Sequence, residues 1–428
     1  RFTMNKKNKL KILLLAFNLQ SDVAPLGLSY LKAYAEKYHK DVIIEIKEFS
    51  MGQRLGYETN KNTELQALSY IKLTKPDLVA FSCYIWSADI AMNFARAIKQ
   101  ISKQTKVCLG GVEISKDTIN ENIDFAIAGE GEIAFKELID HLKNERPIEK
   151  VHNIIARNEE HQLIHGQKTE LKNLDELPFP YTIIENKEFT VVRIETARGC
   201  TFNCKFCHYA KPTLRYFSLD YLKTNLSYLF DNFQFKYLTF LDANFNSNKE
   251  RMFEILDIVQ QNVTKHQRKI SIHIELRPEL IDEDTIKRFK EYSFKIDTEL
   301  GLQSTNKQVL QAVGRPTNIK RVEQALKLLN EHHIKYKIDL MYGLPKDNFY
   351  KFLQSCRFII KYATKQKQVV AHHYMQLNNT ELQKNKELVR FTPNNSSMII
   401  KTESQDAYDL YLTKLFLDQL NQELICFK

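Results

Sequence analysis

Three cysteines lie close together in one short segment of the chain. Cys200, Cys204 and Cys207 are separated by three and then by two residues. Thiolates are preferred ligands of iron–sulfur clusters and of zinc. Three thiolates would bind three irons of a cubane and leave the fourth iron open to a small molecule, whereas four thiolates would close the cluster. The segment therefore favours a cluster that can bind a small molecule directly.

Two other metal sites use similar residues. The segment from Cys204 to His208 matches the haem-attachment pattern C-x-x-C-H, but haem is attached after export and we find no export signal. A structural zinc ion could bind the three cysteines and His208, although adjacent Cys and His side chains rarely reach one tetrahedral ion. Both alternatives stay open, and the second would make the chain a non-catalytic metal-binding protein.

The other cysteines and the apolar runs bear on where the protein resides. The chain has seven cysteines, of which Cys83, Cys108, Cys356 and Cys426 lie elsewhere, in apolar or helical surroundings. This usage is typical of a metal site in a reducing compartment and not of a disulfide framework. The apolar run at 10–17 is too short to span a bilayer. We therefore expect a soluble, cytoplasmic protein without a membrane partner.

The net charge could indicate a polyanionic partner. The formal net charge is +10 and the isoelectric point is about 9.0. However, the lysines are spread along the whole chain, whereas a nucleic-acid-binding segment gathers them in one basic block. We therefore expect no nucleic acid among the partners.

The first third of the chain alternates β-rich and helical segments. The predicted strands cover 11–17, 42–49, 78–82, 106–109 and 125–128, and the predicted helices cover 26–38, 62–74, 88–102 and 132–142. This order predicts a doubly wound, Rossmann-like parallel sheet. Ligands of such sheets bind at the carboxyl ends of the strands, where Gly110-Gly111 and Gly129-Glu130-Gly131 fall. Turns explain these glycines equally well, so alone they identify no ligand.

A second series of strands and helices begins near residue 190. The predicted strands cover 190–195, 237–241, 270–275, 295–300 and 335–340, and the predicted helices cover 219–233, 249–260, 282–292, 306–312, 319–332 and 350–364. This alternation predicts a (β/α)6-type partial TIM barrel, whose chemistry lies at the C-terminal ends of the strands. The cysteine segment directly follows the first of these strands.

The two series divide the chain into domains. We predict an N-terminal domain over 4–145 and a barrel over 188–367, joined by a proline-marked linker over 146–187 with a hairpin. The remaining residues, 368–428, form a short C-terminal extension that ends in a helix over 406–424.

The CxxxCxxC segment, with Phe206 before its last cysteine, resembles the signature of the radical S-adenosylmethionine (SAM) superfamily. Further segments similar to that family follow in the expected order. They are LTFLDANFNSNKER at 238–251, IELRPE at 274–279, ELGLQS at 299–304, Gly314-Arg315, Asp339 and Gly343-Leu344-Pro345. This ordered series is far more specific than the cysteines alone.

The N-terminal sheet resembles the cobalamin-binding domain that precedes the barrel in one large subgroup of the superfamily. The matching segments are PLGLSYL at 25–31, FSCYIW at 81–86, GGVE at 110–113 and GEGE at 129–132. The resemblance implies a cobalamin site formed by Ser82, Cys83, Tyr84, Gly110, Gly111, Gly129 and Glu130. No D-x-H-x-x-G segment marks a histidine ligand for cobalt, and members of this subgroup often bind cobalamin without one. A vestigial or substrate-gripping domain is the alternative.

The resemblance also implies the cofactors and their contacts. The three cysteines would hold a 4Fe-4S cluster whose open iron binds the amino and carboxylate groups of SAM, and the reduced cluster would cleave SAM to a 5'-deoxyadenosyl radical. The candidate contacts to SAM or substrate are Phe206, Asp242, Asn244, Glu275, Arg277, Gln303 and Asp339. Glu275 and Arg277 are two residues apart on one strand, so they could grip the ligand as a pair. Each of these charges could instead form a salt bridge at the barrel rim.

With cobalamin bound, the resemblance implies methyl transfer to an unactivated carbon of a peptide or small natural product. Without cobalamin, hydrogen abstraction would lead to epimerisation, cyclisation or bond formation. Either reaction needs an electron donor such as flavodoxin or ferredoxin. Relatives that modify transfer RNA share the barrel but carry extra cluster cysteines and a small basic C-terminal barrel, neither of which is evident here. A non-catalytic metal-binding protein is the alternative from a different class.

Overall fold

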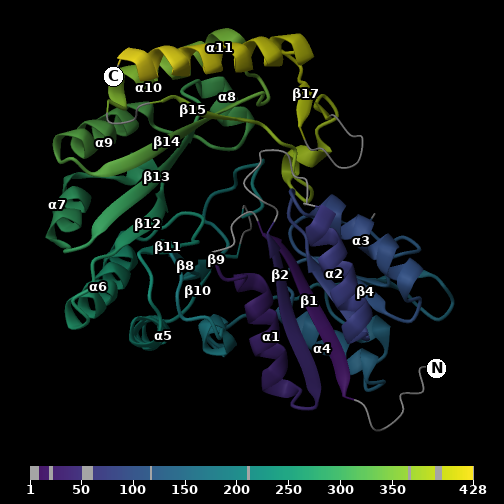
Figure 1. Cartoon of the computed structure of the whole chain (residues 1–428). Helices are drawn as coiled ribbons and strands as arrows, with labels where there is room; N and C mark the ends of the chain where they lie inside the picture. The colour runs from purple at the N-terminus through teal and green to yellow at the C-terminus, as the bar shows by residue number, and fades with distance from the viewer. Residues whose placement is uncertain are drawn as a thin grey trace. The chain divides into compact units, whose positions relative to one another are not determined.

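The computed structural model describes residues 9–18, 23–50, 61–115, 118–209, 213–364, 368–390 and 398–427. The chain forms two compact units, Arg1–Lys187 and Glu188–Lys428 (Figure 1). Each unit contains its own large sheet, as the two predicted series of strands require.

The first unit is built on a seven-stranded sheet of order β2-β1-β3-β4-β5-β6-β7. Its strands are β1 (Leu10–Asn18), β2 (Val42–Ser50), β3 (Leu78–Ser82), β4 (Lys106–Gly110), β5 (Phe125–Ile127), β6 (Ile154–Arg157) and β7 (Leu163–His165). Its helices are α1 (Leu26–Tyr38), α2 (Lys61–Thr74), α3 (Ala88–Ile101) and α4 (Glu132–Leu142). Strands β1 to β5 pair in parallel. The predicted doubly wound sheet is therefore confirmed.

Different helices cover the two faces of this sheet, and strand β1 shows the pattern. Ile12 and Leu14 pack in one core with residues of α1 and α4. Leu13, Leu15 and Phe17 pack in the other core with residues of α2 and α3. Successive strand residues point to opposite faces, so each face of β1 contributes to one of the two cores. A nearly continuous apolar run is therefore what a strand buried on both faces requires.

The predicted linker contributes to this sheet. Strand β6 pairs antiparallel with β5, and β7 pairs antiparallel with β6. The short 3-10 helices η1 (Ile148–Lys150), η2 (Leu174–Glu176) and η3 (Pro180–Ile183) lie before and after this hairpin. The predicted hairpin is confirmed, and it extends the sheet of the first unit; the domain boundaries themselves stay a prediction.

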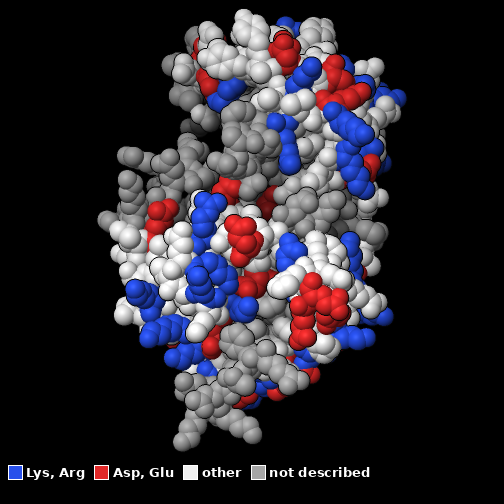
Figure 2. All heavy atoms as spheres, turned by 90° about the vertical axis from the view of Figure 1, so that its right-hand side faces the viewer, with Lys and Arg blue, Asp and Glu red and all other residues white. Residues whose placement is uncertain are grey.

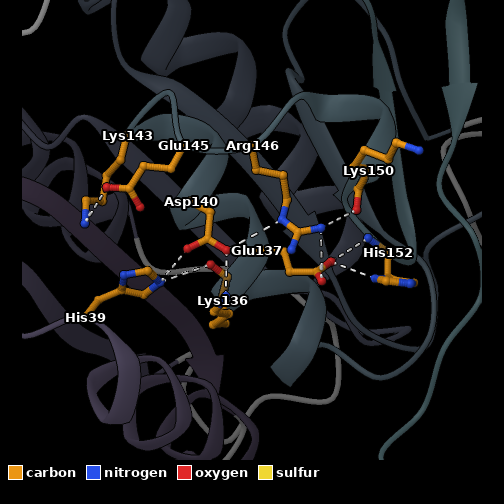
Figure 3. Close-up of polar contacts among 9 residues, drawn as sticks. All are labelled: His39, Lys136, Glu137, Asp140, Lys143, Glu145, Arg146, Lys150 and His152. Atoms are coloured by element: carbon orange, nitrogen blue, oxygen red, sulfur yellow. Dashed lines mark hydrogen bonds and ion pairs between the residues drawn. The ribbon is translucent and has the colours of Figure 1, made fainter.

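Charged side chains surround helix α4 and form what we call the α4 network, shown in Figure 3. Its members are Glu137, Asp140, His39, Lys136, Arg146 and His152. Oε2 of Glu137 accepts hydrogen bonds of 2.8 Å from both the backbone N and Nδ1 of His152. Oδ2 of Asp140 lies 2.7 Å from Nζ of Lys136. The network links α4 to the end of α1 and to the residues around η1.

The second unit is built on a six-stranded sheet of order β15-β14-β13-β12-β11-β8. Its strands are β8 (Val191–Ile194), β11 (Tyr237–Phe240), β12 (Ser271–Leu276), β13 (Lys295–Gln303), β14 (Lys335–Tyr342) and β15 (Val370–His373). All neighbouring strands are parallel, which confirms the predicted partial barrel. Strand β15 comes from the predicted C-terminal extension.

Helices connect these strands and lie along the outer side of the sheet (Figure 1). They are α5 (Leu219–Asn232), α6 (Lys249–Lys265), α7 (Glu283–Glu291), α8 (Lys307–Ala312), α9 (Ile319–Glu331) and α10 (Phe349–Tyr362). A polar side chain caps the N-terminus of each one, from Ser218, Asn248, Asp282, Asn306, Asn318 and Asn348. Such caps satisfy backbone N–H groups that lack a partner within the helix. The capping residues therefore set where each of these helices begins.

Smaller elements complete the second unit. They are β9 (Ala197–Arg198), β10 (Arg215–Tyr216), β16 (Val389–Arg390), β17 (Ile399–Lys401), η4 (Pro278–Leu280), η5 (Glu381–Lys384) and α11 (Ala407–Phe427). Helix α11 lies beside α10, where the rings of Phe349 and Phe416 are 5.3 Å apart (Figure 1). In the described part of the chain, no helix combines the length and the hydropathy needed to cross a bilayer.

The surface charges are mixed on the face that Figure 2 draws. Lys and Arg side chains alternate there with Asp and Glu side chains and do not gather in one basic area. A surface that tracks a nucleic-acid backbone needs a continuous positive stripe. This face offers none, and the absence of a nucleic-acid partner stays a prediction.

Candidate active site

One cavity of the second unit brings the cysteine segment to the ends of the barrel strands. Its volume is about 230 Å³. It is lined by Cys200, Phe202, Cys204, Phe206, Cys207, Ala243, Asn244, Glu275, Leu276, Arg277, Glu299, Gly301, Gln303, Arg315 and Asp339. Every residue predicted for the cluster and for SAM lines this cavity, except Asp242.

Two glycines allow the cysteine segment its conformation. Gly199 has a φ of +91°, and a Cβ atom there would lie 2.4 Å from the backbone O of Thr213. Gly314 has a φ of +66°, and a Cβ atom there would lie 2.7 Å from the backbone O of Asn203. Any larger residue would collide with backbone at both positions. The cysteine segment therefore packs closely against backbone at two places. Gly199 lies against Thr213, just before β10, and Asn203 lies against Gly314, just after α8.

The cysteine sulfurs receive polar contacts that suit thiolate ligands. Nη1 of Arg315 donates to Sγ of Cys204 at 3.3 Å, and the backbone N of Phe202 donates to Sγ of Cys200 at 3.5 Å. Burial raises the pKa of Cys200, while the positive charges of Arg277 and Arg315 oppose this increase. Cations and N–H groups favour the thiolate, and hydrogen bonds to sulfur tune iron–sulfur clusters. The residues therefore fit a cluster bound by three thiolates beside a cavity.

A single metal ion fits less well. Among the described residues, no group of three or more His, Cys, Asp and Glu side chains is arranged to hold one ion. The described residues include His208 and all three cysteines of the segment.

Arg277 has contacts within the fold, and its grip on a ligand together with Glu275 stays a prediction. Its guanidinium forms an ion pair with Glu279, and its central carbon lies 3.9 Å from the ring centre of Phe202. The same group donates to the backbone O of Pro316 at 3.2 Å. The side chain of Arg277 is only 4% exposed. Through its contacts with Phe202 and Pro316, it joins the cysteine segment to the residues after α8. Glu275, in contrast, stays open to the cavity.

Asp242 lies outside the cavity and contacts Thr196. Its two carboxylate oxygens accept hydrogen bonds from Oγ1 of Thr196 at 2.6 Å and from the backbone N of Thr196 at 3.1 Å. Burial raises the pKa of Asp242 to about 7. Thr196 lies four residues before Cys200, so Asp242 positions the start of the cysteine segment. The predicted contact between Asp242 and SAM stays a prediction.

Three acidic side chains line the cavity, and we call Glu275, Glu299 and Asp339 the cavity carboxylates. Nζ of Lys337 lies 3.3 Å from Oε1 of Glu299 and 3.1 Å from Oδ2 of Asp339. Burial and the neighbouring carboxylates raise the pKa values of Glu275 and Asp339 to about 7. The pKa of Glu299 is lowered, because hydrogen bonds with Asp339 and Lys337 outweigh the burial that would raise it. The three groups are therefore closely coupled.

Phe202, Glu299, Gly301 and Arg315 line the cavity without a role predicted from the sequence. Glu299 and Gly301 lie on the same face of β13 as Gln303, so the two-residue period of a strand could have identified them. A Cβ atom on Gly301 would lie 2.8 Å from Nε2 of Gln303. The glycine therefore leaves room for Gln303, whose own φ of 71° is unusual for a residue other than glycine.

The residues predicted for cobalamin lie at the carboxyl ends of β3, β4 and β5. A Cβ atom on Gly111 would lie 2.4 Å from the backbone O of Cys83, so the segments after β3 and β4 are in close contact. The ring of Tyr84 stacks on Trp86 at 4.7 Å and is 38% exposed. Backbone without large side chains beside the exposed ring of Tyr84 suits a broad ligand such as a corrinoid.

Two of these residues have other contacts. The side chain of Cys83 is fully buried, and burial raises its pKa to about 12. Oε2 of Glu130 accepts a hydrogen bond of 3.3 Å from the backbone N of Leu171, and Nδ2 of Asn153 donates to the backbone O of Glu130 at 2.9 Å. Cys83 and Glu130 therefore shape the loops. Ser82, Tyr84, Gly110, Gly111 and Gly129 stay the candidates for contact with a ligand.

Two known domain families match the chain. Residues 12–139 match the B12 binding domain, and residues 194–359 match the Radical SAM superfamily. The first match covers the parallel strands β1 to β5 of unit 1, and the second covers the cysteine segment and the strands β11 to β14. The order of the two domains is the order expected from the sequence.

Similar proteins carry related activities in their names. An uncharacterized methyltransferase of Pyrococcus horikoshii is 25% identical over 338 residues, which are 76% of this chain and 70% of the relative. The cobalamin-dependent radical SAM methyltransferase TokK of Streptomyces tokunonensis is 25% identical over 305 residues, and the match spans 65% of this chain but 44% of TokK.

A solved structure shares the fold. The cobalamin-dependent SAM radical enzyme OxsB, solved with aqua-cobalamin and SAM bound, has a TM-score of 0.73 and 15% identity over 95% of this chain and 66% of OxsB. At this identity the likeness concerns the fold. The two domain matches show that the chain combines a B12-binding domain with a radical SAM domain that follows it.

Proposed function

We propose that the protein is a cobalamin-dependent radical SAM methyltransferase that acts on an unactivated carbon of a peptide or small natural product. The observation that carries this proposal is the cavity in which three cysteines meet the polar ends of the barrel strands, in a chain that also has a B12-binding domain. The names of two relatives, which are methyltransferases, support the same reaction.

The residues of the cavity would divide the work between them. When bound, the cluster and SAM supply a 5'-deoxyadenosyl radical and cobalamin supplies a methyl group. In this proposal the three cysteines hold the cluster, and Arg315 stabilises the thiolate of Cys204 through its hydrogen bond of 3.3 Å. The residues that contact SAM from the cavity wall are Phe206, Asn244, Glu275, Arg277, Gln303 and Asp339.

We also propose an electron donor and a cellular compartment for the protein. A reductant such as flavodoxin or ferredoxin would supply the electron, as in other members of the superfamily. The six cysteines with described side chains are free of disulfides, which suits a reducing compartment such as the cytoplasm. A reaction without cobalamin is the competing proposal, and it predicts cleavage of SAM by protein that binds no corrinoid.

The cysteines provide the first test. Cys200→Ala, Cys204→Ala and Cys207→Ala should each lose most of the iron, the visible absorption of the cluster and the release of 5'-deoxyadenosine from SAM under reducing, oxygen-free conditions. Cys356→Ala is the matched control, because Cys356 is buried in α10 outside the cavity. Full iron content in the triple variant would contradict the proposal.

Cobalamin is tested separately. Protein produced with cobalamin and purified without oxygen should show corrinoid absorption in addition to that of the cluster. If the cluster and SAM cleavage are present but the corrinoid bands are absent, the competing reaction without cobalamin is supported. If neither appears, the chain is a binding protein.

A further inference from the structure

We propose that Arg251 is a positioning residue for the iron–sulfur cluster, because it holds together the two ends of the β9–β10 loop. We give this name to residues 197–216, which carry the three cysteines. The inference rests on the proposed function, because it concerns the cluster of the same site. It adds a residue outside the cavity to those that the reaction needs. Three features of the second unit support it.

The first feature is a side chain that contacts both ends of the β9–β10 loop. Nη2 of Arg251 donates to the backbone O of Thr196 at 3.2 Å and to the backbone O of Phe217 at 2.7 Å. Thr196 directly precedes β9, and Phe217 directly follows β10. The backbone N of Phe217 also donates to the backbone O of Thr196 at 3.1 Å. One residue of α6 therefore fastens the base of the loop that carries the cysteines.

The second feature is that Arg251 is itself held in place. It lies in the first turn of α6, where its backbone N donates to the capping side chain of Asn248 at 3.0 Å. Its guanidinium carbon lies 4.5 Å from the ring centre of Tyr216 in β10, within the range of a cation–π contact. Because the backbone and the guanidinium are both fixed, the two contacts with carbonyl groups hold the loop at a defined place beside α6.

The third feature is that Thr196 is bound from two sides. Asp242 accepts hydrogen bonds from its backbone N and its Oγ1 atom, and Arg251 donates to its backbone O. Asp242 and Arg251 belong to one stretch of the sequence, LTFLDANFNSNKER at 238–251. Thr196 lies four residues before Cys200, so this stretch fixes the start of the β9–β10 loop next to the first cysteine.

A second, smaller cavity places Arg251 near the cysteine segment. Its volume is about 20 Å³, enough for about one water molecule. Thr196, Cys200, Asp242 and Arg251 are among the residues that line it. Arg251 does not line the larger cavity in which the three cysteines meet. Its role is therefore to position the loop and not to bind the cofactor.

Arg268 offers a matched control in the same unit. It donates to the backbone O of Phe233 at 2.9 Å and to the backbone O of Phe235 at 3.0 Å, and its guanidinium carbon lies 4.4 Å from the ring centre of Phe235. Like Arg251, it binds two backbone carbonyl groups and an aromatic ring. However, Arg268 lies just before β12 and its partners just before β11, at the amino ends of the strands. The β9–β10 loop follows the carboxyl end of β8, so only Arg251 contacts it.

The test measures how firmly the cluster is held and not only turnover. Wild-type protein, Arg251→Gln and Arg268→Gln are reconstituted without oxygen, and the release of iron to the chelator ferrozine is followed by absorption. Arg251→Gln should release iron about tenfold faster than the wild type, because it loses two hydrogen bonds and a cation–π contact at the loop. Arg268→Gln should stay within about twofold of the wild type, because its contacts lie away from the loop.

Two further measurements separate positioning from a general loss of stability. The electron paramagnetic resonance spectrum of the reduced cluster with SAM should change in Arg251→Gln alone, because it reports the surroundings of the thiolate ligands. Arg251→Lys keeps a positive donor without the planar guanidinium, so it should restore part of the iron retention. Hydrogen exchange of the β11 amides compares how far Arg251→Gln and Arg268→Gln weaken the sheet.

Two outcomes would overturn the inference. They are equal rates of iron release from Arg251→Gln and Arg268→Gln, and a spectrum of Arg251→Gln identical to that of the wild type. If Arg251→Gln does not fold, Tyr216→Leu replaces it, because it removes a ring that is 38% exposed and leaves both carbonyl contacts. Tyr216→Leu should release iron about threefold faster than the wild type, and an unchanged rate contradicts the inference.

The same experiment distinguishes this inference from the proposed function. Release of 5'-deoxyadenosine by the wild type is measured in parallel. Wild-type protein that binds no cluster contradicts both. Wild-type protein that binds the cluster and cleaves SAM, while the two arginine variants behave alike, contradicts this inference and leaves the proposed function intact.

Discussion

The α4 network and the cavity carboxylates are two groups of acidic side chains with different charge balance. In the α4 network, Glu137 and Asp140 are surrounded by Lys136, Arg146 and two histidines (Figure 3). In the cavity, Lys337 pairs with Glu299 and Asp339, and His273 and His372 lie 3.7 Å from Glu299 and 3.9 Å from Asp339. The two groups differ in that Glu275 forms no ion pair among the described residues, and in that the pKa values of Glu275 and Asp339 are raised to about 7.

This difference separates stability from function. Acidic groups that are fully paired hold neighbouring elements together, so their loss should weaken the fold. Acidic groups that repel each other and have raised pKa values are typical of functional sites. Removal of a charge from the cavity should therefore leave the fold intact or stabilise it, and impair binding instead.

The largest effect is expected for Glu137→Ala in the α4 network. Glu137 accepts hydrogen bonds from the backbone and the ring of His152 and lies 3.4 Å from Arg146. Loss of this buried acceptor should lower the free energy of unfolding by about 2 to 3 kcal/mol. Trp86, the one tryptophan of the chain, lies in unit 1, so its fluorescence during urea unfolding measures the effect.

Glu145→Ala is the control for this prediction. Glu145 is 53% exposed and forms an ion pair with Lys143, so its loss should change the free energy of unfolding by less than about 0.5 kcal/mol. Equal effects of the two substitutions would show that burial and pairing do not distinguish the α4 network.

Much of the fold could be predicted from the sequence. The apolar run of β1 and the Asn, Asp and Ser caps of α5 to α10 are local signals, and the predicted elements agree with the structure within a few residues at most ends. The exceptions are short or end in unusual conformations. Strand β13 continues to Gln303 through Gly301, which the sequence does not favour, and the two-residue strands β9 and β10 have no periodicity to detect.

The site was less predictable than the fold. The spacing of the cysteines and the positions of the strand ends were enough to identify most residues of the cavity. Sequence could not show that Asp242 turns toward Thr196 or that Arg277 binds Glu279, because both choices depend on neighbours that only the folded chain brings close. Lys337 belongs to no sequence motif. It lies beside Glu299 because the register of β13 and β14 places the two residues opposite each other.

A smaller effect of opposite sign is expected for Glu275→Gln. The pKa of Glu275 is raised to about 7, so the folded state binds more protons than the unfolded state between the ordinary pKa of a glutamate and pH 7. Stability therefore falls as the pH rises through this range. Because the side chain is open to the solvent of the cavity, the substitution should stabilise unit 2 by only about 0.5 kcal/mol at pH 8 and have almost no effect at pH 5.

Hydrogen exchange of the β12 and β13 amides at the two pH values measures this change. Glu299→Gln is a useful comparison, because Glu299 loses a contact with Lys337 and should not stabilise the sheet to the same extent. Destabilisation by Glu275→Gln at pH 8 would show that Glu275 has a partner within the fold.

The smallest effect is expected from salt. An increase from about 0.05 to 0.5 M NaCl shortens the Debye length severalfold and weakens attraction and repulsion between accessible charges alike. The α4 network should lose a few tenths of a kcal/mol of stability, since several of its ion pairs are partly exposed. Repulsion among the cavity carboxylates should weaken, so unit 2 should gain a similar amount. The stability of unit 1 is measured by Trp86 fluorescence, and that of unit 2 by hydrogen exchange of β13. Added salt should therefore change the two stabilities in opposite directions. Changes of the same sign would mean that salt acts on both units through something other than these two groups of charges.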